Sequence, residues 1–121
     1  MKRNIIISLI LLISIGMFLF LPSIRKSSDT IRNSILSELP LGSSMKQTQK
    51  FLKLRKWELR SISRHTGYYH SKLHREIGKQ SIRAYAGHYQ SWLRVDVSIF
   101  FGFDSEDKLI DLYVRKEQEG I

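Results

Sequence analysis

The chain has 121 residues and a formal charge of +9 at pH 7. This length fits one domain at most. Because the sequence contains no cysteine, it can form neither a disulfide nor a thiolate metal site, and it cannot carry a lipid-modified cysteine. The charge is unevenly distributed. Residues 43–83 contain eleven Lys and Arg and two acidic residues, whereas residues 92–121 contain four Lys and Arg and seven acidic residues. Such a basic segment is either a solvated surface or a contact for nucleic acid or anionic lipid.

Residues 1–24 are interpreted as a membrane anchor or signal segment. Lys2 and Arg3 precede an apolar run at residues 5–21, and these seventeen residues would span about 26 Å as a helix. The hydrocarbon core of a bilayer is roughly 30 Å thick. We therefore predict an N-terminal transmembrane helix. The alternative is a signal peptide cleaved after Gly16, with the small residues Ser14 and Gly16 at the −3 and −1 positions. The basic start favours a single-pass protein of the bacterial inner membrane with its C-terminal domain in the periplasm, whereas the cations after the run favour a cytoplasmic domain.

Residues 25–42 read as a linker with a short helix. Asp29 is the residue expected to cap this helix. Apolar residues then follow at helical spacing: Ile31, Ile35, Leu36 and Leu39. Pro40 ends the segment.

Residues 43–121 are predicted to form a small α+β domain. Ser44 and Gln47 have the spacing of a capping box, which predicts an amphipathic helix over about 45–55. Strands are predicted at 57–66, at 81–90, and at 92–103 followed by a return strand from Ile110. In the second strand, the small residues Ala84, Ala86 and Gly87 suggest close packing or a bulge. A long loop is expected between the first two strands. The predicted core comprises Met45, Phe51, Leu52, Leu93, Val95, Val97, Ile99, Phe101, Ile110, Leu112 and Val114.

Three acids, Asp104, Glu106 and Asp107, lie between the last two strands. A calcium loop of the EF-hand type starting at Asp104 would need glycine at its sixth position, where Leu109 stands. Aspartate is a common turn residue, because its side chain can accept hydrogen bonds from nearby backbone amides. The acids are therefore predicted to form a hairpin turn.

The order of these segments resembles the BamE-like family of small bacterial envelope proteins, which have the SmpA/OmlA fold. The matching residues are Gly42, Ser44, Phe101, Phe103, Asp104, Lys108 and Leu109, within residues 38–116. No lipobox cysteine follows the apolar run. The resemblance implies two short helices packed on an antiparallel sheet of three or four strands, and a role in binding other proteins of the envelope.

Enzyme chemistry has little support in the sequence. His70 and His74 have the i, i+4 spacing of two zinc ligands and His65 is near, so a small metal-dependent hydrolase is one alternative. Nearby Lys and Arg disfavour a bound cation, and no metal or cofactor is predicted. Asp96 and Asp111 are expected to face solvent on the hairpin rather than act as a catalytic pair.

The sequence thus predicts a membrane-anchored, non-catalytic envelope protein that contacts the membrane through residues 5–21 and acts as a protein-interaction or assembly module. A cytoplasm-facing domain that binds nucleic acid or anionic lipid is the alternative. Aromatic and Arg side chains are typical of interface hot spots. The predicted partner-binding residues are Trp92, Arg94, Phe100 and Tyr113 on the polar sheet face, and Tyr68 and Tyr69 in the loop.

Overall fold

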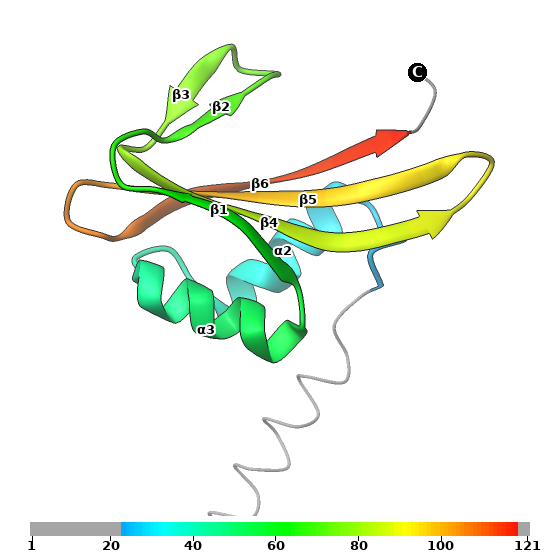
Figure 1. The fold of residues 1–121 in the computed structure, drawn as a ribbon, viewed down its shortest axis with the longest axis horizontal. Coiled ribbons are helices and arrows are strands. Elements are labelled where there is room, and N and C mark those ends of the chain that lie inside the picture. The colour runs from blue at the N-terminus through cyan, green and yellow to red at the C-terminus, as the bar shows by residue number, and fades with distance from the viewer. Residues whose placement is uncertain (1–22, 119–121) are drawn as a thin grey trace, which may run out of the picture.

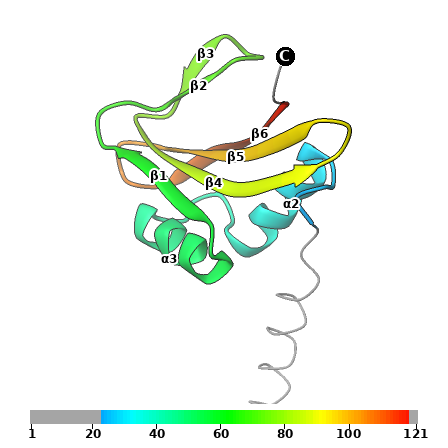
Figure 2. The same ribbon diagram turned by 45° about the vertical axis from the view of Figure 1, so that its right-hand side comes forward.

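The computed structural model describes residues 23–118. Its helices are α2 (Ser28–Glu38) and α3 (Met45–Arg55), and its strands are β1 (Glu58–Ser63), β2 (Tyr68–His70), β3 (Arg75–Ile77), β4 (Gln80–Gln90), β5 (Arg94–Phe103) and β6 (Leu109–Gln118). Four strands form an antiparallel sheet in the order β1-β4-β5-β6, and β2 pairs with β3 in a separate hairpin. The helices cover one face of the sheet, and the β2–β3 hairpin stands over the other (Figure 1, Figure 2). The predicted α+β class, with two helices on a sheet of four strands, is confirmed.

The prediction of a transmembrane helix needs correction. The apolar run at residues 5–21 lies outside the described residues. Within residues 23–118, neither α2 nor α3 is long and apolar enough to cross a bilayer. The fold that the structure describes therefore has no transmembrane helix, and it does not support a single-pass inner-membrane protein with a periplasmic domain.

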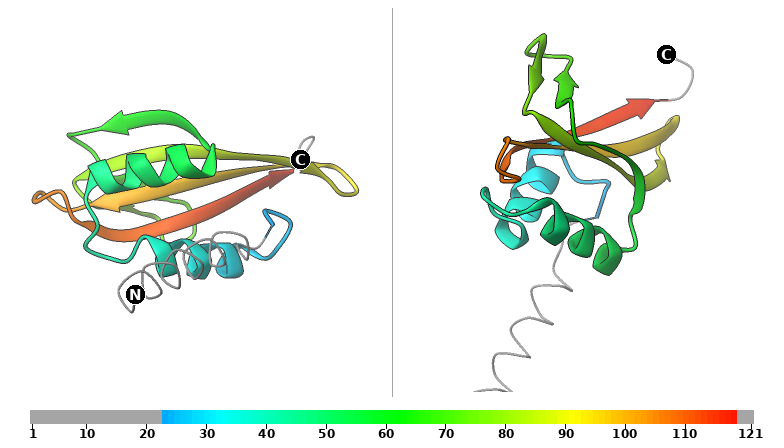
Figure 3. Two further views of the ribbon diagram at one scale, coloured as in Figure 1. Left: turned by 90° about the horizontal axis from the view of Figure 1, so that it is seen from below. Right: turned by 60° about the vertical axis from the view of Figure 1, so that its left-hand side comes forward.

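Helix α2 belongs to the domain rather than to a linker. Its N-cap is Ser27, whose hydroxyl accepts a hydrogen bond from the Thr30 amide, and not Asp29, which lies in the first turn. Ile31 and Ile35 are buried and join the same core as the sheet residues. Figure 3 shows α2 under β6 and α3 nearer to β1.

Helix α3 begins as the sequence predicts. The Ser44 hydroxyl accepts from the Gln47 amide at 3.1 Å, and the Gln47 side chain accepts from the Ser44 amide at 2.8 Å. This reciprocal capping box satisfies two backbone donors that the first turn leaves without helical partners. The buried side of α3 carries Met45, Thr48, Phe51 and Leu52.

The core lies between the helices and the sheet, and nine of the eleven predicted core residues are buried there. The other two, Leu93 and Ile110, are 38% and 43% exposed. Leu93 lies in the turn before β5 begins. Ile110 is the extra residue of a β-bulge, because Gly102 pairs with Asp111 while Phe103 pairs with Leu109. The bulge turns Ile110 outward, and Leu109 is buried in its place.

Two further local predictions concern backbone geometry. Gly87 lies at a register shift of β4 and has a φ of +112°, so of the two expected alternatives, close packing or a bulge, the structure has a bulge at Gly87. In the β5–β6 turn, Asp104 Oδ1 accepts from the amides of Glu106 and Lys108 at 2.9 and 3.0 Å. The acidic residues therefore form a turn, as predicted.

The segment between β1 and β4 was predicted to be a long loop, and it is the β2–β3 hairpin. Tyr68 pairs with Ile77 and His70 with Arg75, with a turn between them. Gly67 Hα lies against the backbone where this hairpin leaves the sheet: a Cβ at this position would lie 2.0 Å from the Ile77 carbonyl oxygen.

The two edges of the sheet differ. At β6, the Gly42 amide donates to the Leu109 carbonyl and the Leu109 amide donates to the Ser43 carbonyl, both at 2.8 Å. Farther along β6, Arg32 Nε donates to the Leu112 carbonyl at 3.1 Å. At β1, no backbone hydrogen bond joins the outward edge to another segment within residues 23–118.

Candidate functional site

The face of the sheet that points away from the helices is here called the outer face. Because side chains alternate along a strand, the burial of Val95, Val97, Ile99 and Phe101 places their neighbours on this face. Cross-strand pairing adds residues from β1, β4 and β6. The outer face carries Arg60, Arg83, Tyr85, Asp96, Ser98, Phe100, Tyr113, Arg115 and Glu117, with Arg94 at its end.

The β2–β3 hairpin packs its inward side on part of the outer face. The ring centroid of Tyr68 lies 5.9 Å from that of Phe100, and the centroid of His70 lies 4.2 Å from that of Tyr113. Phe100 and Tyr113 are themselves 6.3 Å apart. Gly102 lies beneath this contact, where a Cβ would approach the Tyr68 ring to 3.0 Å. The hairpin and the sheet thus form one aromatic cluster.

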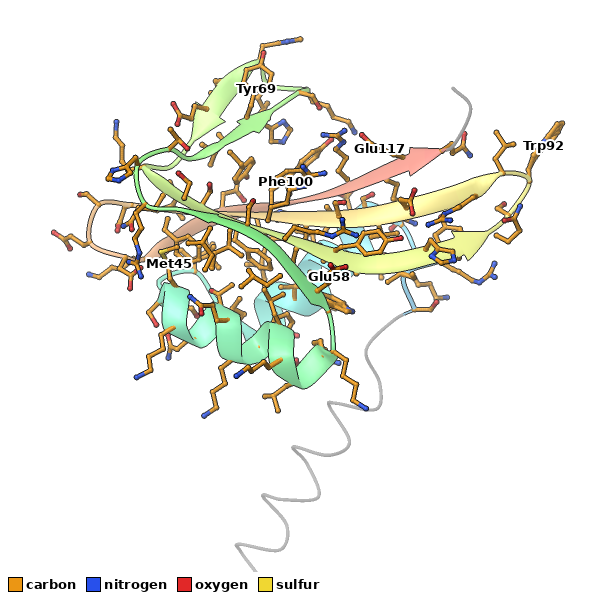
Figure 4. All side chains as sticks on the ribbon, in the orientation of Figure 1. Met45, Glu58, Tyr69, Trp92, Phe100 and Glu117 are labelled. Atoms are coloured by element: carbon orange, nitrogen blue, oxygen red, sulfur yellow. The ribbon has the colours of Figure 1, made fainter. Side chains whose placement is uncertain are left out.

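The six predicted partner-binding residues occupy four different places. Phe100, Tyr113 and Tyr68 meet in the aromatic cluster, and Tyr68 is only 4% exposed. Tyr69 points away from the sheet on the hairpin and is 63% exposed, and Trp92 is 81% exposed at the tip between β4 and β5, far from Phe100 (Figure 4). Arg94 lies beside Asp96. The structure therefore brings Tyr68 of the predicted loop into contact with Phe100 and Tyr113 of the sheet face. Trp92 and Tyr69 lie outside this contact.

The Tyr68 hydroxyl has an unusual position. Burial raises the pKa of this phenol above its ordinary value, and its oxygen has no hydrogen-bond partner among the described residues. The ring, rather than the hydroxyl, makes the contacts that hold the hairpin. Tyr68 thus positions the hairpin and does not face solvent.

Beside the aromatic cluster, the outer face has a shallow depression of about 240 Å³. It is lined by Arg60, Arg83, Tyr85, Arg94, Asp96, Ser98 and Glu117. Ser98, the small side chain between Tyr85 and Arg115 across the strands, leaves the space open. Sequence reasoning missed Arg83, Tyr85 and Ser98. Their signal was the alternation of β4, where Ile82 and Ala84 are buried and Arg83 and Tyr85 face outward.

Asp96 is held by two neighbours at the end of the depression. The Tyr85 hydroxyl donates to Asp96 Oδ1 at 2.7 Å, and Arg94 donates to the same oxygen at 3.3 Å. The hydrogen bond from Tyr85 is the main cause that lowers the pKa of Asp96, and the charge of Arg94 adds to it. The same hydrogen bond raises the pKa of Tyr85. Asp96 is therefore held as a carboxylate, which makes it a poor general base.

Replacing Tyr85 by phenylalanine should raise the pKa of Asp96 toward the ordinary aspartate value. The variant removes the donor that favours the ionised form, while Arg94 stays. Because the folded pKa is depressed, this interaction stabilises the fold above the unfolded pKa and is lost as the pH falls through the folded pKa. A carboxyl-carbon NMR titration of wild type and Tyr85→Phe measures the shift. An unchanged Asp96 pKa would mean that Arg94 alone sets it.

The histidines do not gather as the hydrolase hypothesis requires. His70 packs on Tyr113, and its Nδ1 accepts from the Leu73 amide at 3.2 Å. His74 occupies the hairpin turn with a φ of +53°. Within residues 23–118, no three His, Cys, Asp or Glu side chains are placed to hold a metal ion. Asp111 and Asp96, the two carboxylates considered as a catalytic pair, do not lie together, because Asp111 pairs with Arg32 at 2.6 Å.

The lysines of α3 and the aromatic cluster lie on opposite sides of the sheet. Lys46, Lys50 and Lys53 are exposed on α3, under the sheet, whereas the aromatic cluster lies on the outer face. A surface for single-stranded nucleic acid combines cations that follow the phosphates with exposed rings on which bases stack. The arginines of the outer face do lie beside the rings, but Phe100 and Tyr113 are half-buried against Tyr68 and His70, which leaves little ring surface on which bases could stack.

Comparison of the chain with protein-family models, with curated proteins and with solved structures finds no match. The resemblance to the BamE-like proteins therefore stays a prediction.

Proposed function

We propose that this domain is a non-catalytic protein-interaction module that binds a partner through its outer face. The observation that carries the proposal is the junction of the hairpin and the sheet. Rings from β2, β5 and β6 hold a fixed cluster, and arginines surround it: Arg83 and Arg115 lie 5.3 and 5.8 Å from the Phe100 ring centroid. Arginine and aromatic residues are enriched where protein interfaces gain most of their affinity.

The side chains of this face are also held before any partner arrives. Arg60 stacks over Tyr85 at 4.6 Å, and Arg94 is tied to Asp96. Fixing long side chains in the free protein lowers the entropy that binding must overcome. The opposite side of the molecule is different in kind, because the exposed lysines of α3 are single flexible cations.

Site-specific photocrosslinking in cells that express the full chain tests the proposal. A benzophenone amino acid at Ser61, which pairs with Arg83 on the outer face, should give a discrete product with another protein. The same group at Lys50, exposed on α3, is the control and should not give that product. Equal products from both positions, or none from Ser61 in a folded protein, would refute binding through the outer face.

A further inference from the structure

Resting on the function proposed above, we infer that the depression beside the aromatic cluster binds an acidic side chain, Asp or Glu, in an extended segment of the partner protein. Arg83 is the residue that receives this carboxylate. The inference names the chemistry of the partner at one position of the outer face, which the proposed function leaves open.

Three of the four arginines on the outer face pair with carboxylates, and Arg83 is the fourth. Arg60 pairs with Glu58 at 3.2 Å and Arg94 with Asp96 at 3.3 Å, and Arg115 pairs with Glu117. Among the described residues Arg83 has no carboxylate within ion-pairing distance, although it lies on a central strand with three cation–anion pairs around it. Four arginines against three carboxylates leave one positive charge, and it lies at the depression.

Arg83 is also held in place for such a role. Its guanidinium lies 5.3 Å from the centroid of Phe100, and Phe100 is fixed by Tyr68 and Tyr113. Stacking on an aromatic ring leaves the edge of the guanidinium plane free, and this edge is the part that binds a carboxylate with two parallel hydrogen bonds. Ser98 provides the space beside it.

The same lining favours a protein carboxylate over a nucleic acid or a lipid surface. Asp96 and Glu117 line the depression together with the arginines. A run of phosphates would bring several negative charges against these two carboxylates, whereas a single acidic side chain needs only Arg83. The rings of Phe100 and Tyr113 are half-buried and packed against Tyr68 and His70 of the hairpin, which leaves little ring surface for the base stacking of single-strand binding surfaces.

Fluorescence anisotropy with the full chain tests the inference. The probe is a fluorescein-labelled peptide of alternating Ser and Glu, six residues long by design, and the matched probe has Gln in place of Glu. The Glu probe should bind at least about tenfold more tightly than the Gln probe, because hydrogen bonds between ions are the stronger class. Arg83→Gln should remove about that same factor, and Arg83→Lys should restore part of it.

Lys50→Gln is the matched control, since it removes the same charge from the α3 side and should leave affinity within about twofold. Arg83 is exposed, so its variants should stay folded, as circular dichroism will verify. Equal binding of the Glu and Gln probes, or equal loss in Lys50→Gln and Arg83→Gln, would overturn the inference.

Two competitors decide between partner classes. An oligothymidine of about twelve nucleotides and vesicles of anionic phospholipid supply phosphate in two forms. If either binds more tightly than the Glu probe and loses affinity in Arg83→Gln, Arg83 serves phosphate and the inference fails. If the Ser61 crosslink persists unchanged in Arg83→Gln, the acidic side chain is refuted while binding through the outer face stands.

Discussion

Replacing Phe101 by alanine should lower the free energy of unfolding by about 3–5 kcal/mol, the usual cost of removing a buried phenylalanine. Phe101 is 0% exposed on β5, one of the two central strands of the sheet, and it packs in the core shared with α2 and α3. The cavity would lie in the core between the sheet and the helices. Because β5 is paired with β4 and β6 on its two sides, it cannot easily move to fill the cavity. Urea denaturation followed by circular dichroism measures the change.

Trp92→Ala is the matched control, because it removes a larger aromatic side chain that is 81% exposed. Its free energy of unfolding should stay within about 0.5 kcal/mol of wild type. A loss below about 1 kcal/mol in Phe101→Ala would contradict the described core.

Replacing Gly67 by alanine should detach the β2–β3 hairpin from the outer face at a cost of about 1–3 kcal/mol, the usual range for overpacking. The new Cβ would lie 2.0 Å from the Ile77 carbonyl oxygen and 2.5 Å from that of Gly78. Both are backbone atoms, so no side chain can turn aside to make room. The sheet itself does not pass through Gly67, and it should keep its core.

NMR contacts between the rings of Tyr68 and Phe100 measure this effect, and they should weaken or vanish in Gly67→Ala. Tyr69→Ala, on the exposed side of the same hairpin, is the control and should keep them. Unchanged ring contacts in Gly67→Ala would show that the chain can move at Gly67 without releasing the hairpin. A detached hairpin should also loosen Arg83, because Phe100 would lose its contact with Tyr68.

Elements with strong local signals could be predicted from the sequence. The capping box before α3 depends only on Ser44 and Gln47, which are three residues apart, and in β5 every second residue from Val95 to Phe103 is apolar and buried. The β2–β3 hairpin escaped prediction because its strands are three residues each, too short for any period to stand out. Ile110 was misplaced because a bulge changes the face of a strand without changing its composition.

The candidate site could be predicted only in part. Alternation along β5 and β6 places Phe100 and Tyr113 on the polar face, and the structure brings these two together. That Tyr68 would be buried against them depends on how the hairpin folds back, which is a tertiary contact without a local signal. Arg83 acquires its role only through the register of β4 and β5, which sets it opposite Phe100.

The unequal edges of the sheet limit how copies of this domain can join. A further strand can pair only with an edge whose backbone amides and carbonyls are free. On β6, part of these groups already form hydrogen bonds with Gly42, Ser43 and Arg32. A domain with two open sheet edges can pair edge to edge without limit and form a fibre. A domain with one open edge can pair with a single copy of itself, and no open edge then remains. For the four-stranded sheet within residues 23–118, edge-to-edge association through β1 would therefore stop at a closed, two-fold pair.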